Sequence, residues 1–124
     1  MDNLSRFLLI LAECESGASA KAWGDGGYAC GRYQQHPSFY ASWCPSPGEF
    51  GGRERSWDWA FDMAVRRFYA ACIADKPDAS LTRIAMAYHL HGQVRWDGWD
   101  SAYLDRWLAA VKVIEARSAT GAES

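Results

Sequence analysis

The stretch that predicts the fold is residues 12–36, which read AECESGASAKAWGDGGYACGRYQQH in a chain of 124 residues. An apolar run precedes this stretch and predicts a helix that delivers Glu15 near its end. A segment with glycines at positions 24, 26, 27 and 31 follows. Because glycine permits positive φ and lets the backbone approach a ligand closely, this segment predicts a tight hairpin that lines a groove.

Glu15 continues an apolar stripe of the predicted helix. Leu4, Leu8, Leu11 and Glu15 fall at i, i+4, i+7 and i+11, which is one helical face. Glu13 is about 200° away around the helix and should point elsewhere. A carboxyl at a core-facing position loses solvation, which raises its pKa. A general acid working near neutral pH needs such a raised pKa. The alternative is an exposed glutamate at a frayed helix end.

Five motifs, in chain order, resemble the core motifs of goose-type lysozymes and soluble lytic transglycosylases. The first three are Glu15-Ser16-Gly17, the WGDGG of residues 23–27 and the GRYQ of residues 31–34. Ala87-Tyr88-His89 is similar to the A-Y-N of these families, and residues 100–103 to the D-x-Y region that opens their last helix. The resemblance implies a mostly α-helical α+β, lysozyme-like fold with a small β-hairpin lining the cleft.

The resemblance also implies a reaction, cleavage of the β-1,4 bond between N-acetylmuramic acid and N-acetylglucosamine in peptidoglycan. Glu15 would protonate the leaving oxygen, and Asp25 matches the first family aspartate. Goose-type lysozymes often carry a second aspartate shortly after the glutamine, where this chain has His36. A lytic transglycosylase needs no such base, because the hydroxyl of the substrate itself attacks. Asp25 has a local alternative, since aspartate in a glycine turn often hydrogen-bonds its own backbone.

Tyrosines and polar side chains around these motifs are the candidate substrate-binding groups. The phenol of Tyr88 can donate a hydrogen bond to a carboxylate or a sugar, although its place on a helical stripe also fits a core tyrosine. His89 stands where the resembling families have asparagine. The side chains that we expect to contact the glycan are Tyr28, Gln34, His36, Tyr88 and Tyr103.

Composition restricts the class of partner. The net charge of -2 and the pI of about 5.9 argue against nucleic-acid binding through bulk positive charge. Seven tryptophans supply both core and cleft side chains. Trp96 and Trp99 are expected in a turn-rich loop that forms one lip of the cleft. The four cysteines contain no CxxC pair, and His89 and His91 at i, i+2 do not share a helical face, so we expect no metal and no cofactor. We favour buried free thiols over disulfides. The spacing of the cysteines cannot show which of them would pair.

The apolar run at residues 7–11 is interpreted as a core helix. It is too short to span a bilayer, and cleaving it as a signal peptide would remove the helix that carries Glu15. A wall-cutting enzyme without a signal needs another route to the wall, such as release of a phage lysin by a holin, or a place in a virion or secretion system. We expect a monomer whose partner is the peptidoglycan glycan strand, with no nucleic acid and no membrane.

The chain is predicted to form one catalytic domain over residues 1–117, followed by a flexible tail at 118–124. Two readings compete with the muramidase: a non-catalytic glycan-binding or structural module of the same fold, and an enzyme acting on chitin or chitosan. The predicted helices cover residues 4–15, 39–43 and 57–75, a segment beginning at Ser80, and residues 101–117, with a loop after residue 43. Asp2 or Asn3 is expected to cap the first of these helices and Asp100 the last, and Leu108 of the last helix is expected to pack inward.

Overall fold

The protein is mainly α-helical, as the sequence predicts. The computed structural model describes residues 1–19, 23–24, 29–43 and 57–120, with the backbone alone at 23, 24, 30, 57, 58 and 120. The predicted loop at 44–56 lies outside these residues. Within the described part the helices are α1 (Asn3–Ser16), α2 (Pro37–Trp43), α3 (Trp57–Asp75), α4 (Leu81–Leu90) and α5 (Ser101–Thr120).

Two short strands occupy the glycine-rich region. β1 (Trp23–Gly24) pairs antiparallel with β2 (Ala29–Cys30), with Trp23 opposite Cys30 and Gly24 opposite Ala29. Residues 25–28, which join the two strands, lie outside the described residues, and so do Asp25 and Tyr28. The hairpin predicted to line the cleft therefore stays a prediction.

The ends of α1 follow from its sequence. The Asp2 side chain accepts a hydrogen bond from the Ser5 backbone N–H at 2.7 Å, which satisfies one of the free donors of the first turn. Gly17 ends the helix in the left-handed conformation, with φ of 65°. Leu8 and Leu11 are buried along the predicted stripe. The prediction of 4–15 was thus one residue short at each end.

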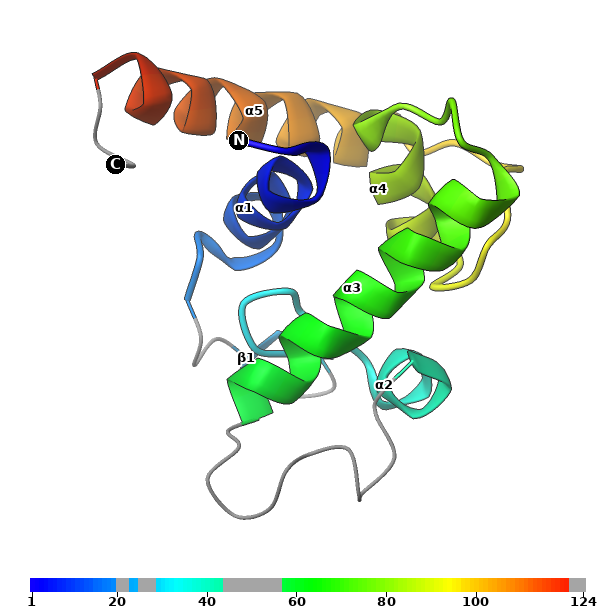
Figure 1. The fold of residues 1–124 in the computed structure, drawn as a ribbon. Coiled ribbons are helices and arrows are strands. Elements are labelled where there is room, and N and C mark those ends of the chain that lie inside the picture. Colours follow the sequence, from blue (N-terminus) through cyan, green and yellow to red (C-terminus); the bar gives the residue numbers. More distant parts are fainter. Residues whose placement is uncertain (20–22, 25–28, 44–56, 121–124) are drawn as a thin grey trace.

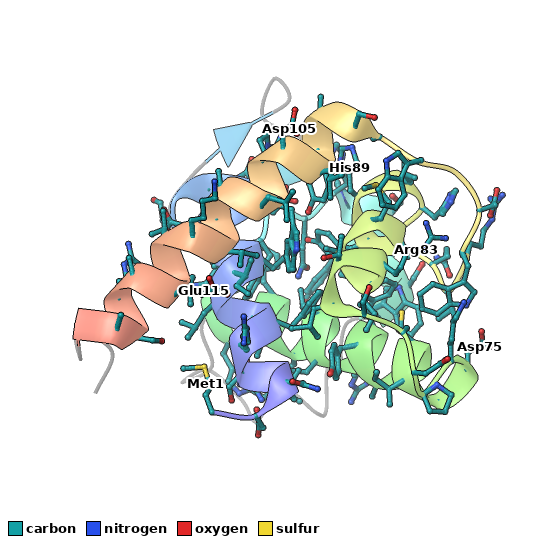
Figure 2. The ribbon with its side chains drawn as sticks, turned by 90° about the horizontal axis from the view of Figure 1, so that it is seen from above. Met1, Asp75, Arg83, His89, Asp105 and Glu115 are labelled. Atoms are coloured by element: carbon teal, nitrogen blue, oxygen red, sulfur yellow. The ribbon has the colours of Figure 1, made fainter. Side chains whose placement is uncertain are left out.

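The helix that carries Glu15 lies against the last helix. α1 packs most extensively against α5, and α4 contacts both of them, whereas α2 packs on α3 (Figure 1). Figure 2 shows α5 lying over α1, and toward the Glu115 end of α5 an Arg6 nitrogen lies 2.9 Å from a Glu115 oxygen. Phe7 and Trp107 join these two helices in the core, with ring centroids 5.9 Å apart.

The helix predicted at 57–75 and the predicted start of the last helix at residue 101 are confirmed, whereas α2 begins two residues before the predicted residue 39. Ser80 caps α4 by accepting the Arg83 N–H, and α2 begins at Pro37, a residue suited to the first helical position. The last helix, however, reaches Thr120, so residues 118–120 are helical rather than a tail. Leu108, predicted to face inward, is 45% exposed. Within the described residues, no helix is both long enough and apolar enough to cross a membrane.

Candidate functional site

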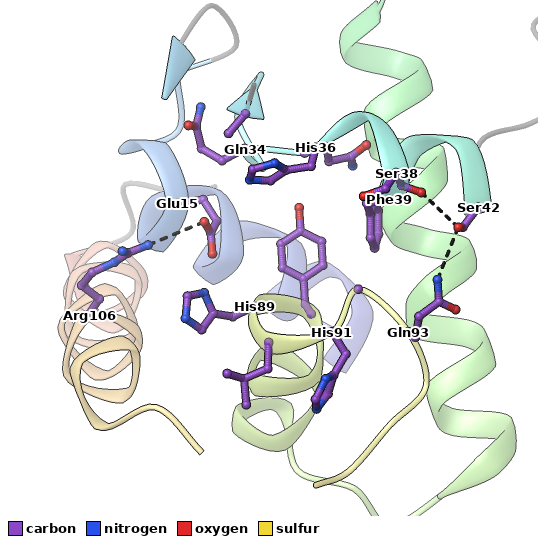
Figure 3. Close-up of a pocket in the computed structure, with 15 residues that line it drawn as sticks. Glu15, Gln34, His36, Ser38, Phe39, Ser42, His89, His91, Gln93 and Arg106 are labelled. Carbon is purple, nitrogen blue, oxygen red and sulfur yellow. Dashed lines mark hydrogen bonds and ion pairs between the residues drawn. The ribbon is translucent and has the colours of Figure 1, made fainter. Parts of the chain in front are cut away.

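Glu15 lies at the last turn of α1 with its side chain only 10% exposed. The Tyr103 hydroxyl donates to Glu15 Oε2 at 2.6 Å. An Arg106 guanidinium nitrogen lies 3.6 Å from Oε1, and Figure 3 shows this contact as a dashed line. Tyr103 and Arg106 are three residues apart on α5, so they share a helical face. Both contacts favour the charged carboxylate, while burial opposes it. The predicted inward direction of Glu15 is confirmed.

Glu13 points away from this site. One of its carboxylate oxygens lies 3.5 Å from an Arg117 nitrogen on α5. Glu13 is not among the residues that line the pocket in front of Glu15. The two neighbouring glutamates of α1 are therefore in different surroundings, as their helical positions predict.

Tyr103 is a fixed hydrogen-bond donor behind Glu15. It is 1% exposed, and burial, followed by the charge of Glu15, raises its pKa well above the usual value. The phenol therefore keeps its proton at neutral pH. The imidazole of His89 stacks flat on the Tyr103 ring, with centroids 3.9 Å apart and an interplanar angle of 5°. The Arg106 guanidinium carbon lies 5.2 Å from the same ring centroid.

Asp100 joins His89 to the start of α5. One oxygen of its carboxylate lies 2.8 Å from His89 Nε2, and the other accepts the Tyr103 backbone N–H at 3.1 Å. The predicted cap of the last helix is thus confirmed. The hydrogen bond with His89, and then the one from Tyr103, lowers the pKa of Asp100 below its usual value. The group is therefore ionised at neutral pH and can only accept hydrogen bonds.

A pocket of about 540 Å³ opens beside Glu15. In Figure 3, Gln34 and His36 form one side of it and His89 and His91 the other, with Glu15 toward one end. All three histidines of the chain line this pocket. Among its described lining residues, Glu15 is the only carboxylate. The pocket therefore offers one acid in a wall made mainly of neutral polar, imidazole and aromatic groups.

Tyr88 lines the pocket, but its hydroxyl proton is directed at the backbone. The hydroxyl donates to the Tyr33 carbonyl oxygen at 2.5 Å, and the residue is 8% exposed. The Tyr33 hydroxyl in turn donates to Asp62 at 2.7 Å. Tyr88 therefore ties α4 to the segment between β2 and α2, and its contact with a glycan stays a prediction.

The serine and glycine positions of the motifs have structural roles. The Ser16 hydroxyl donates to the Arg32 carbonyl oxygen at 2.7 Å and so ties the end of α1 to the segment that carries Gln34 and His36. Gly31 has φ of 81°, and a Cβ atom there would lie 2.7 Å from a ring carbon of Phe61. Only glycine fits this approach without displacing the ring.

The structure brings four of the seven predicted site residues to the pocket wall. These are Glu15, Gln34, His36 and Tyr88. Tyr103 contacts Glu15 from behind, whereas the other two predicted residues lie outside the described part. Arg106 was missed, although its spacing from Tyr103 could have indicated it.

Trp96 and Trp99, expected as a cleft lip, are not among the lining residues of the pocket. Trp96 lies near Asp75, and Trp99 lies near Arg83.

Two of the four cysteines are described with their side chains, and both are free thiols. Cys14 is half-buried and Cys72 is buried. Burial, and next the charge of Glu15, raises the pKa of the Cys14 thiol to about 11. Burial likewise raises the pKa of Cys72 to about 12. For these two residues the free-thiol prediction is confirmed.

Comparison with known proteins finds no matching family model, no matching curated protein and no matching solved structure.

Proposed function

We propose that this protein is a lysozyme-like glycosidase that cleaves peptidoglycan, with Glu15 as general acid. The observation that carries the proposal is the nearly buried Glu15 carboxyl, which lies at the end of an apolar helix and beside a pocket of about 540 Å³. Polar and aromatic groups in the pocket wall, including Gln34 and Tyr88, suit the hydroxyl groups and apolar faces of sugar rings. The motif resemblance at residues 12–36 supports the same substrate.

In the proposed reaction, protonated Glu15 donates its proton to the glycosidic oxygen as the bond from that oxygen to the anomeric carbon breaks. Because Oε2 accepts a hydrogen bond from the Tyr103 hydroxyl, the acidic proton is carried on Oε1. The carboxylate left after transfer is stabilised by Tyr103 and by the Arg106 charge. Water then adds to the anomeric carbon and loses a proton to Asp25, the proposed second carboxylate, which leaves a reducing muramyl end.

A lytic transglycosylase is the second candidate, and one observation favours it. His36 lies in the pocket wall and stands where goose-type lysozymes often carry a second aspartate, and this reaction needs one acid–base group. The C6 hydroxyl of the muramic acid attacks the anomeric carbon while Glu15, now a carboxylate, takes up the hydroxyl proton. The product carries a 1,6-anhydro end, and no water is consumed.

Digestion of purified peptidoglycan, followed by mass spectrometry of the released fragments, tests both candidates. Reducing muramyl ends support hydrolysis, and a pool dominated by anhydro-muropeptides overturns the hydrolase assignment. Loss of turbidity of bacterial walls, with chitin as a control polymer, separates a muramidase from an enzyme acting on chitin. Binding to walls without any fragment release would identify a non-catalytic module and would contradict the proposal.

A further inference from the structure

The position of the Tyr103 hydroxyl depends on how the Tyr103 ring is held. This hydroxyl donates to Glu15 Oε2 at 2.6 Å, so a small rotation of the ring moves the donor away from the carboxyl. His89 covers the ring with its own imidazole plane, at 3.9 Å between centroids and 5° between planes. Stacking alone still allows the two rings to slide past each other, so a second constraint on His89 is needed.

Asp100 supplies that constraint and also fixes the backbone of Tyr103. An ionised carboxylate only accepts hydrogen bonds, so His89 Nε2 must carry the hydrogen in the 2.8 Å contact with Asp100. The second Asp100 oxygen accepts the Tyr103 N–H at 3.1 Å. One carboxylate thus orients the imidazole that stacks on the Tyr103 ring and the backbone from which that ring extends.

We propose that His89 and Asp100 form a positioning pair that holds the Tyr103 hydroxyl on Glu15 Oε2 and so keeps the acidic proton on Oε1. The proposal rests on the proposed function for its catalytic meaning, while the geometric coupling can be measured without activity. His89 and Asp100 are positioning residues here, since they act on Glu15 through Tyr103.

The first test replaces Asp100 by asparagine, which can still accept the Tyr103 N–H and cap α5. Its amide offers no charged acceptor to His89 Nε2. We expect kcat for wall cleavage to fall about 10- to 100-fold, since small displacements of catalytic groups have effects of this size, with KM changed less than about twofold. Asp97→Asn is the matched control, because Asp97 lies in the same loop and pairs with Arg95. It should behave like wild type.

The second test compares two replacements of His89. His89→Gln keeps a planar amide that can stack on Tyr103 and donate to Asp100, whereas His89→Ala keeps neither interaction. We expect the glutamine variant to retain clearly more kcat than the alanine variant at similar thermal stability. An equal loss of kcat in both variants, or a rise in KM with kcat unchanged, would show a substrate contact and overturn the positioning role.

The third test is independent of activity. Carboxyl carbons of ¹³C-labelled glutamate are titrated by NMR, and the Glu15 signal is assigned by its absence in Glu15→Gln. We expect Asp100→Asn to move the Glu15 midpoint to higher pH, because a loosened Tyr103 donor stabilises the carboxylate less. Among the described residues, Cys14 and Arg106 also lie near Glu15, and His36 and His89 line the same pocket; all four remain in this variant. Loss of the Asp100 charge would by itself move the midpoint to lower pH, so a shift to higher pH reports the loosened donor.

The NMR result separates the two proposals. If wild type releases no glycan fragments but the midpoint still moves in Asp100→Asn, the glycosidase proposal fails and the positioning pair stands. If wild type cleaves walls while Asp100→Asn leaves both kcat and the Glu15 midpoint unchanged, the positioning pair is wrong.

Discussion

Glu15 and Tyr103 are 88 positions apart in the sequence, yet the Tyr103 hydroxyl oxygen lies 2.6 Å from Glu15 Oε2. The donor is buried and keeps its proton at neutral pH, so it marks one carboxyl oxygen as an acceptor. The pairing of a helix-end carboxyl with a buried phenol is therefore the central relationship of the site.

Glu15→Gln should abolish wall cleavage while the fold is retained. The amide cannot donate an acidic proton, and loss of a general acid costs about 10²-fold or more in rate. Release of soluble muropeptides measures the effect. Glu13→Gln is the control, because its carboxylate lies near Arg117 and outside the pocket. Cleavage by Glu15→Gln at the wild-type rate would exclude this site.

Tyr103→Phe should both destabilise the protein and change its pH profile. Removing a hydrogen bond to a charged group costs about 2 kcal/mol of unfolding free energy, measurable by urea denaturation. Glu15 loses a contact that stabilises its charged form, so it keeps its proton to higher pH. The alkaline limb of the pH–activity profile should therefore move to higher pH. The plateau kcat should fall about tenfold, because the carboxyl loses its orientation. An unmoved limb would contradict the assigned hydrogen bond.

Alkylation of Cys14 should be slow at pH 8 and should accelerate as the pH approaches its thiol pKa of about 11. Because the charge of Glu15 contributes to this raised pKa, Glu15→Gln should lower the pKa and speed the reaction. Iodoacetamide labelling, followed by mass spectrometry of the peptide that contains Cys14, measures both rates. Equal rates in the two proteins would mean that the Glu15 charge does not affect the pKa of the Cys14 thiol.

Two glycines with similar backbone conformations should respond differently to alanine. Gly17 and Gly31 both have positive φ, which costs a residue with a Cβ about 1–2 kcal/mol. A Cβ atom at Gly17 meets nothing within 4 Å, whereas at Gly31 it would lie 2.7 Å from Phe61. Gly31→Ala should therefore lose a further ~1–3 kcal/mol. Equilibrium urea unfolding of both variants compares them, and equal losses would refute the close packing at Gly31.

Asp25→Asn distinguishes the two reaction types. If Asp25 activates water, this variant should lose about 10²-fold in rate, and the wild-type products should carry reducing ends. A variant that keeps most of its activity and yields 1,6-anhydro ends would instead assign Asp25 to shaping the glycine turn. Mass spectrometry of the digested peptidoglycan measures both properties.

The helices could be predicted because their signals are local. Three helices begin just after a capping residue that precedes a segment of helical apolar periodicity: Asp2, Ser80 and Asp100. The inward position of Glu15 also followed from helical spacing. Leu108 was predicted wrongly, because the heptad-like spacing of the last helix does not show how wide its buried face is.

The polar partners of the site could not be predicted with the same success. The contact between Glu15 and Tyr103, and the one between His89 and Asp100, join different helices, and spacing within one helix says nothing about them. Tyr88 shows the same limit. Its helical stripe placed it inward, but only the tertiary structure shows that its hydroxyl donates to the Tyr33 carbonyl oxygen.

The packing of α1 on α5 also determines when the site can exist during synthesis. Glu15 is translated early, but the groups that orient it are supplied by residues 101–120. Contacts of such long sequence separation form late, since the intervening chain must first close a large loop. A nascent chain still missing the last helix therefore carries Glu15 without its orienting donor. The proposed glycan cleavage should accordingly begin only after residues 101–120 have left the ribosome.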